Sequence, residues 1–314
     1  MPGTAPVVSI GVPVYNGERF VREALTSLLA QDFGDLEVVV SDNASTDGTE
    51  EICRDLARAD HRLRYVRHPV NRGGAANFNA AFHLRHPDAR YFKWAASDDV
   101  HDPAYLSTVL AALRADPGAV LGHCHAGDID EQGRPLREWG DQGLPVGHDD
   151  VAVRFGALAR RNYQCFAIFG VVPVPVLAAT RLLGYYAESD RVLLAELSLR
   201  GRFVEVPQVL FHRRQHDARS VRLYPTARDR VAWFNPDLVG RPVFPEWRLG
   251  RGYLGAVART PLPVADRARC LGQMAAWSVG HAPHLARNVG RTTKDVLGGR
   301  TPVRRVAPLT AGRG

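Results

Sequence analysis

Short apolar runs alternate with amphipathic segments over the first 125 residues of the chain. Apolar runs typical of buried strands occur at 7–12, 36–41, 63–68, 90–95 and 119–124. Segments with apolar residues three or four positions apart, as on one face of a helix, lie between them at 18–31, 47–59, 74–85 and 103–116. Strands that are apolar throughout and alternate with helices predict an α/β fold with a mostly parallel sheet covered on both faces.

This alternation ends after residue 125. Within 127–165, residues 127–150 are rich in glycine, proline and charge, which predicts a hairpin or loop. A helix is expected at 189–200 and a pair of strands at 202–214, and the pattern beyond 222 is weakly helical. We therefore expect one α/β domain over 1–222, divided into halves 1–125 and 126–222, followed by a mainly helical extension over 223–314.

Positive charge is concentrated at the end of the chain. The net charge is +7, and residues 251–314 hold eleven Lys or Arg against two Asp or Glu, a balance of +9 that leaves about −2 for the rest. Such a basic extension favours contact with an anionic membrane or a polyanion, or it is a solvated end. It carries no recognisable nucleic-acid-binding module, so no nucleic-acid partner is expected.

Cysteine usage and the first residues of the chain indicate the cellular compartment of the protein. The four cysteines form no CxxC pair, which indicates reduced thiols. The first residues do not resemble a signal peptide, and the longest apolar run is too short to span a bilayer and contains Pro173 and Pro175. We expect a cytoplasmic protein, with peripheral contact at the inner face of the membrane through its basic end.

Polar and acidic residues follow three of the predicted strands. In a parallel sheet, ligands bind at the carboxyl ends of the strands, so these residues are candidates for a site. Asp47 and Asp102 are better explained as helix caps. The adjacent carboxylates of Asp98 and Asp99 are different, because they repel each other unless a cation is present. Carboxylate oxygens are the ligands that Mg²⁺ or Mn²⁺ takes together with substrate phosphates, which predicts a divalent-cation site.

Five segments occur in an order similar to that of glycosyltransferase family 2, whose members have the GT-A fold. These segments are VSIGVPVYNGERFVREALTSLLAQ, LEVVVSDNASTDGT, NRGGAANFNAAF, FKWAASDDVHDPAYL and ESDRVLLAELSLRGRFVEVPQVLFHRRQH, and they cover about residues 7–217. The resemblance implies that a sugar is transferred from a nucleotide diphosphate to an acceptor hydroxyl with inversion. It makes 1–125 the nucleotide-binding half and 126–222 the acceptor and catalytic half.

The resemblance also implies roles for individual residues. The nucleotide pocket would be lined by Pro13, Tyr15 and Glu18, with Asp42 bonding the base and Asn43 beside it. Asp98 would lie near the ribose or donor sugar, and Asp99 would be the metal ligand. Asp190 would be the catalytic base, and His216 would close on the diphosphate or the metal. Ala96 stands where many members have an acidic residue.

Several assignments stay open from the sequence. Glu188 competes with Asp190 as the base, and Asp190 could instead cap a helix. Arg72 and the backbone of 71–74 could bind phosphate or form a turn. The basic residues of 212–216 could meet the diphosphate or form an exposed edge. His123 and His125 should share one strand face, without enough ligands nearby for zinc.

The partners expected are a nucleotide sugar, with UDP, dTDP or GDP as the nucleotide, and a sugar or lipid-linked acceptor. The product would be a cell-surface polysaccharide, a glycoconjugate or a secondary metabolite. Two other functions compete with this one: a sugar-phosphate nucleotidylyltransferase, and a non-catalytic protein that binds a nucleotide sugar.

Overall fold

The first half of the chain forms a five-stranded sheet in the computed structural model, which describes residues 5–223, 230–238 and 241–297. The strand order is β3-β2-β1-β4-β8. β8 (Val172–Pro173) pairs antiparallel with β4, and the other pairings are parallel. The parallel strands are β1 (Val8–Val14), β2 (Leu36–Asp42), β3 (Leu63–Arg67) and β4 (Tyr91–Trp94).

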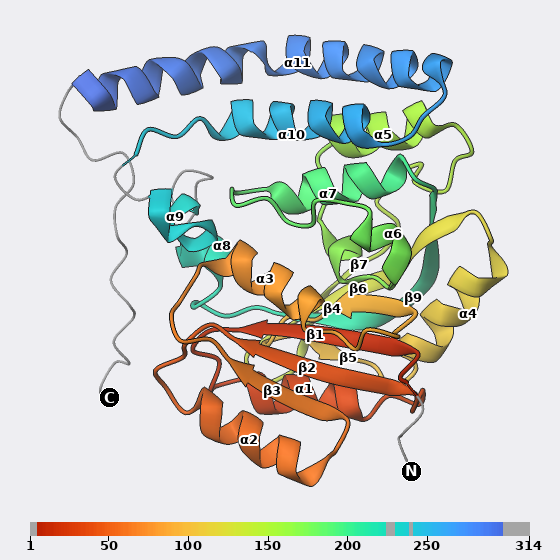
Figure 1. Cartoon of the computed structure of the whole chain (residues 1–314), viewed down its shortest axis with the longest axis vertical. Coiled ribbons are helices and arrows are strands. Elements are labelled where there is room, and N and C mark those ends of the chain that lie inside the picture. Colours follow the sequence, from red (N-terminus) through yellow and green to blue (C-terminus); the bar gives the residue numbers. More distant parts are fainter. Residues whose placement is uncertain (1–4, 224–229, 239–240, 298–314) are drawn as a thin grey trace.

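Helices cover both faces of this sheet, as the sequence predicts. α1 (Val21–Leu29) and α2 (Thr49–Ala59) lie on one face, and α3 (Gly74–His83) lies on the other (Figure 1). Because β4 lies on the opposite side of β1 from β2 and β3, the strand order reverses between β1 and β4. Ligands of open α/β sheets bind at such a reversal.

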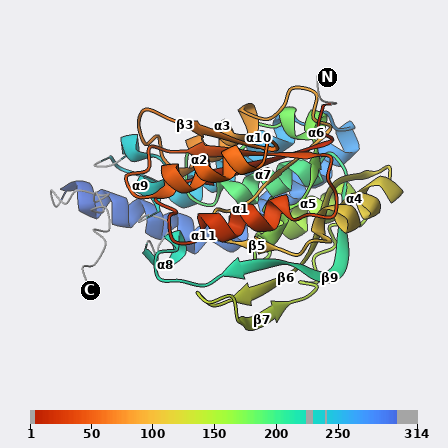
Figure 2. The same ribbon diagram turned by 90° about the horizontal axis from the view of Figure 1, so that it is seen from below.

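A second sheet, in the order β5-β9-β6-β7, follows in the chain. Its strands are β5 (Val100–His101), β6 (Ala119–Ile129), β7 (Pro135–Trp139) and β9 (Arg202–Arg214). They lie together along one side of the molecule (Figure 2). α4 (Tyr105–Ala115) connects β5 to β6. Two sequence predictions are corrected here. The fifth predicted strand, β6, belongs to this second sheet, and the predicted pair of strands over 202–214 is the single strand β9.

The segment 127–165, in which the alternation is lost, contains a helix directly after the hairpin or loop predicted over 127–150. Besides β7 it forms α5 (Val151–Arg160), which Asp150 caps by accepting a hydrogen bond from the Ala152 N–H at 2.8 Å. Val151, Phe155 and Leu158 lie three or four residues apart and are buried in the core. The glycine- and proline-rich flanks conceal this helical period in the sequence.

The remaining elements are η1 (Phe166–Phe169), α6 (Val174–Ala178), α7 (Ser189–Ser198), α8 (Ser220–Leu223), α9 (Val231–Phe234), η2 (Pro236–Leu238), α10 (Pro245–Arg259) and α11 (Val264–Leu297). The α-helices among them stack above the first sheet (Figure 1). α10 packs on α7, and α11 packs on α10 and α5. Trp277 of α11 lies so close to Gly250 of α10 that a β-carbon there would be 2.7 Å from its ring. Glycine is therefore required for this helix pair to approach.

Of the extension predicted over 223–314, residues 224–229, 239–240 and 298–314 lie outside the described residues. Its described part is mainly helical and belongs to the same core as the α/β elements, because Tyr253 and Trp277 pack in one cluster with Phe155 and Leu194. None of the described helices is both long enough and apolar enough to cross a bilayer.

Lys93 lies in the core beneath the site, where it is 1% exposed. Its Nζ is 2.8 Å from His101 Nε2 and 4.6 Å from the centre of the Tyr105 ring. No carboxylate of the described residues forms an ion pair with it. Burial lowers the pKa of Lys93 from 10.5 to about 7, because a charged amine is poorly solvated there.

Lys93→Met is expected to change how stability depends on pH. Between pH 7 and 10.5 the folded amine is neutral while the unfolded amine is charged, so the unfolded chain binds more protons and stability from this group rises with pH. The stability of wild type relative to Lys93→Met should therefore fall by about 1.4 kcal/mol per pH unit as pH is lowered from 10 toward 7. Urea unfolding at several pH values measures this difference.

Lys294 is the only other lysine of the chain, and it is exposed on α11. Lys294→Met removes the same charge without a buried amine and should leave the pH dependence unchanged. Equal curves for the two variants would show that Lys93 stays charged in the folded protein.

Candidate active site

The loops after β1 and β2 are bound to each other at the carboxyl edge of the first sheet. The Asn16 N–H donates to Ser45 Oγ at 2.9 Å, and Asn16 Oδ1 accepts from the Thr46 N–H at 2.8 Å. Glu18 Oε2 accepts from the Gly48 N–H at 2.7 Å, so this carboxylate supports the start of α2. Pro13 is buried inside β1, opposite Ser41.

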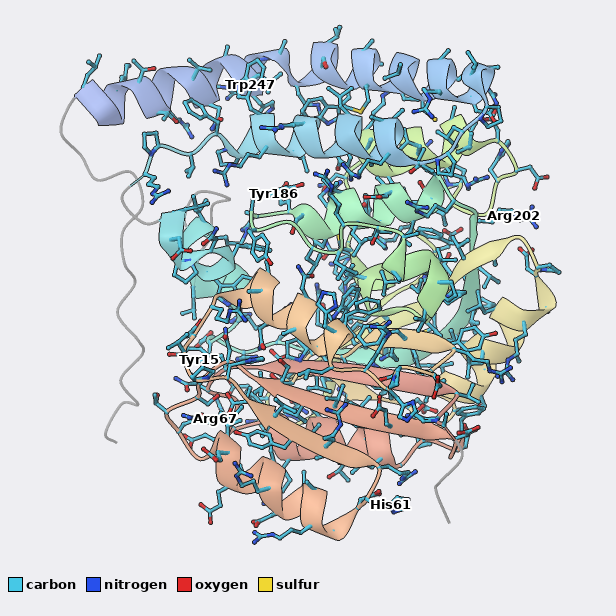
Figure 3. The ribbon with its side chains drawn as sticks, viewed as in Figure 1. Tyr15, His61, Arg67, Tyr186, Arg202 and Trp247 are labelled. Atoms are coloured by element: carbon cyan, nitrogen blue, oxygen red, sulfur yellow. The ribbon has the colours of Figure 1, made fainter. Side chains whose placement is uncertain are left out.

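Tyr15 is exposed, with 43% of its surface accessible. Figure 3 shows Tyr15 and Arg67 at the same edge of the sheet, whereas His61, which precedes β3, lies at the opposite edge. Tyr15 thus stands where a ligand would enter at the carboxyl ends of the strands, and Pro13 and Glu18 support the loop that carries it.

Asp42 is fully buried, and protein groups already occupy both of its carboxylate oxygens. Oδ1 accepts from the N–H and the hydroxyl of Ser45, at 2.9 and 2.6 Å. Oδ2 accepts from the Tyr65 hydroxyl and lies 3.8 Å from Arg67 Nε. Asp42 would therefore have to exchange one of these partners to bond a base directly.

Asn43 organises the loop that precedes α3. Its Nδ2 donates to Asn71 Oδ1 at 2.9 Å, and its Oδ1 accepts from the Arg72 N–H at 2.9 Å. The side chain of Arg72 is exposed. Gly73 has φ +85°, and a β-carbon on it would lie 2.7 Å from the Phe234 carbonyl oxygen. α9 therefore covers the N-terminus of α3, which leaves the Arg72 side chain, and not the helix start, as the group available to a phosphate.

Asp98 and His216 meet at the end of β4, although they are 118 residues apart in the chain. His216 Nε2 lies 2.9 Å from Asp98 Oδ2. His216 is buried, and its ring stacks at a tilt on Phe20, with centroids 4.8 Å apart. Asp98 keeps 30% of its side chain accessible, so this carboxylate is the one that faces solvent.

Asp99 points the other way, into the protein. It is 4% exposed, and its Oδ1 accepts from the backbone N–H of Arg214 at 2.9 Å. Burial, reinforced by the neighbouring charge of Asp98, raises the pKa of Asp99 to about 8. At neutral pH this carboxyl therefore holds a proton for much of the time.

Arg214 fixes this corner, whereas the sequence indicated it only as one of the basic residues of 212–216. Its guanidinium is completely buried, donates from Nε to the Asp98 carbonyl oxygen at 3.1 Å, and forms an ion pair with Glu23 of α1 at 2.7 Å. Arg213 is held by Asp128, at 2.8 Å. The two arginines thus neither form an exposed edge nor point at a diphosphate. Their position in β9, a strand with a buried face, was the only signal in the sequence.

Arg219 is a further cation beside Asp98 and Asp99. It lies one turn after His216 and donates to Gln215 Oε1 at 2.8 Å. Burial and the charge of Arg213 lower its pKa, whereas Asp99 and Asp98 oppose that shift. A partly buried cation next to two carboxyls is suited to receive an anionic group, and the sequence analysis missed it.

Asp190 lies in the first turn of α7 and does not cap that helix. Its Oδ1 accepts from the adjacent Arg191 N–H at 2.9 Å, and Glu188, the residue before the helix, provides no side-chain cap. Burial raises the pKa of Asp190, and the charge of Glu188 raises it further. Glu188 has a left-handed φ of +67° and forms an ion pair with Arg230 at 3.2 Å. A carboxyl with a raised pKa beside a strained residue is typical of functional sites.

The segment 161–166 connects Asp190 to the end of β9. Arg191 donates to the Arg161 carbonyl oxygen at 2.6 Å and stacks on the Tyr163 ring at 4.2 Å. At the other end, Arg213 donates to Gln164 Oε1 at 3.1 Å. Arg191, the neighbour of the candidate base, and Arg213, three residues before His216, thus contact the same short segment.

The Asp98–His216 pair fits a divalent cation in part. Within the described residues, no three His, Cys, Asp or Glu side chains are grouped to hold a metal ion. His216 Nδ1 is buried without a hydrogen-bond partner, so the proton can reside there and leave the Nε2 lone pair for a ligand. One carboxylate oxygen and one imidazole nitrogen suit Mn²⁺ better than Mg²⁺, with phosphate oxygens of a substrate completing the shell.

His123 and His125 face Glu205 at 3.9 and 3.7 Å and share one strand face, as expected.

Known proteins resemble this chain in sequence and in fold. The model of the family described as glycosyl transferase family 2 matches residues 9–169. An uncharacterized glycosyltransferase of Rickettsia typhi is 31% identical over 133 residues, 42% of this chain and 40% of the relative. A GalNAc(5)-diNAcBac-PP-undecaprenol beta-1,3-glucosyltransferase of Campylobacter jejuni is 26% identical over 164 residues, 52% of each protein. The chain therefore spans about half or less of these relatives.

Among solved structures, S. aureus TarS 1–349 in complex with UDP-GlcNAc superposes with a TM-score of 0.64. The superposition covers 92% of this chain and 81% of that chain at 15% identity. At this identity the likeness concerns the fold alone. It confirms the expected GT-A-type α/β architecture with a helical C-terminal region.

Proposed function

The chain belongs to glycosyl transferase family 2 and is an enzyme, and on that premise we propose that it is an inverting, metal-dependent transferase that uses a nucleotide-diphosphate sugar. Family membership favours this function over the nucleotidylyltransferase and the non-catalytic binding protein. The observation that carries the proposal is the Asp98–His216 contact of 2.9 Å beside the reversal of strand order. It brings a carboxylate and an imidazole together where a donor would bind.

The resemblance gave Asp99 as the metal ligand, and the geometry supports a different division of roles. Asp98 and His216 would hold the cation, because Asp98 is the accessible carboxylate and Asp99 is buried. Asp99 would instead fix the turn through the Arg214 N–H. When bound, the divalent cation would neutralise charge on the departing nucleoside diphosphate. Arg219 would add a second positive charge at the same place.

Asp190 would act as the base that takes the proton of the acceptor hydroxyl. A hydroxyl is a weak nucleophile until a base removes its proton in the transition state, and a carboxylate with a raised pKa is a stronger base than an ordinary one. For inversion the acceptor oxygen must attack from the side opposite the leaving nucleotide, so the base that takes its proton must lie on that side. Asp190 meets this requirement in principle, since it comes from α7 and not from the loop of Asp98.

For the donor we propose a UDP sugar, with dTDP and GDP sugars as the other nucleotides to test. The fold match to a TarS complex with UDP-GlcNAc supports UDP. Tyr15 and Arg72 would contact the nucleotide, and Asp42 and Asn43 would shape its pocket. A sugar or lipid-linked acceptor is supported by the Campylobacter jejuni relative, whose name specifies an undecaprenol-linked substrate. The basic C-terminal part would bring the enzyme to an anionic membrane at its inner face.

A donor screen tests this function. UDP, GDP and dTDP sugars are incubated with the enzyme and Mn²⁺, and nucleotide release is measured with and without EDTA. We expect release from one nucleotide series, and its loss with EDTA. Release that continues unchanged in EDTA would contradict the metal role, and no release from any donor, with or without candidate acceptors, would contradict the proposed donor class.

A further inference from the structure

α11 carries a second apolar face that is exposed to solvent in the described structure. Its inner face, with Cys270, Met274 and Trp277, is buried against the rest of the molecule. At about 100° per residue, ten other positions fall within an arc of about 80° on a different side of the helix. All ten are exposed, and all but the threonine are apolar: Val264, Ala268, Leu271, Ala275, Val279, Ala282, Ala286, Val289, Thr293 and Leu297.

This outer face of α11 is long and continuous. α11 has 34 residues, which corresponds to a length of about 50 Å. Val264, Val279 and Leu297 are 85%, 77% and 82% exposed. In Figure 1, α11 forms the outermost layer of the molecule, above α10. A surface helix normally turns its apolar stripe toward the core, so a second stripe with the same period on the outside indicates an interaction surface.

Basic residues accompany the outer face. Arg287 and Lys294 lie on one flank of it, about 100–120° around the helix from its centre. α11 holds five Lys or Arg and two Asp, a net charge of +3. The sequence from 298 to 314 adds four arginines and no acidic residue. Long basic side chains can lie along an apolar surface and extend their charges to phosphate groups above it.

We propose that the outer face of α11 binds in the plane of an anionic lipid bilayer. The apolar residues would enter the boundary between headgroups and acyl chains, and the basic flank would contact anionic headgroups. Charge favours an anionic bilayer over a second copy of the chain as the partner of this face. Pairing two such faces would bring together two helices, each with a net charge of +3, on chains with a net charge of +7. This inference names the surface for the membrane contact proposed above, and it is independent of the transfer chemistry.

Vesicle sedimentation with the full chain tests the inference. The vesicles are phosphatidylcholine alone or phosphatidylcholine with phosphatidylglycerol. The test variant is Leu271→Glu/Val279→Glu, which changes two exposed positions of the outer face. The control is Val70→Glu/Leu136→Glu, which adds the same charge at apolar side chains 60% and 57% exposed elsewhere. Circular dichroism melting confirms that both variants are folded.

Wild type and control should bind the anionic vesicles equally, and the test variant should bind them at least about tenfold more weakly. Binding to neutral vesicles should be weak for all three. Equal binding of test variant and control would overturn the proposal. So would light scattering that shows a wild-type dimer, a monomeric test variant and no vesicle binding, since a second copy would then cover the face. Nucleotide release in solution is measured separately, so failure here leaves the proposed chemistry standing.

Discussion

Asp190→Asn is expected to lower the rate of sugar transfer by about 10²–10⁴-fold while nucleotide binding is retained. General base catalysis typically contributes a factor of this size, and an amide cannot take a proton from the acceptor hydroxyl. The substitution keeps the shape of the side chain and its acceptor oxygen toward the Arg191 N–H. Transfer is measured by product formation, and nucleotide affinity is measured by calorimetry with UDP and Mn²⁺. Loss of nucleotide binding together with transfer would indicate a structural role for Asp190.

The pH profile gives a second test of the same base. Because burial and Glu188 raise the pKa of Asp190, kcat/KM should fall below a pH that lies above the usual range for aspartate. Glu188→Gln is the matched control, since it removes the neighbouring charge and leaves the base in place. It should shift the acid limb of the profile to lower pH without abolishing transfer. If Glu188→Gln abolishes transfer and Asp190→Asn does not, Glu188 is the base.

The first sheet could be predicted from the sequence because its signals are local. Each of its parallel strands is a short and mainly apolar run such as 36–41, and a helix with a clear period lies between successive strands. The second sheet could not be predicted in this way. β6 pairs in parallel with β9, about eighty residues later, and β5 has only two residues, so no local pattern specifies either pairing. The sequence therefore predicts where strands occur better than which strands pair.

The candidate site, like the fold, could be predicted from the sequence only in part. The edge of the sheet that carries Tyr15, Asp42 and Asp98 follows from where the strands end. The direction of each side chain does not follow, because the turn after β4 is fixed by Arg214, more than a hundred residues away. In the sequence, Arg214 is one of several arginines in a basic run. Only its burial shows that it holds the corner together.

Asp98→Asn and His216→Gln are expected to weaken the response to Mn²⁺ and lower transfer by about a hundredfold, whereas Asp99→Asn has a much smaller effect. Removing one of two protein ligands should raise the Mn²⁺ concentration needed for half-maximal rate and reduce neutralisation of the departing diphosphate. Asp99 differs because its pKa of about 8 leaves it partly protonated at neutral pH. Asparagine resembles a protonated carboxyl and can still accept from the Arg214 N–H.

The comparison of Asp98→Asn with Asp99→Asn is internally matched, because the two changes are identical and occupy adjacent positions. Rate is measured against Mn²⁺ concentration for both variants at fixed donor, and metal binding is followed independently by calorimetry in the presence of UDP. If Asp99→Asn loses the Mn²⁺ response and Asp98→Asn keeps it, the metal role belongs to Asp99, as the family resemblance implied. Loss in Asp98→Asn and His216→Gln alone supports the pair at 2.9 Å as the metal ligands, with Asp99 holding the turn that presents them.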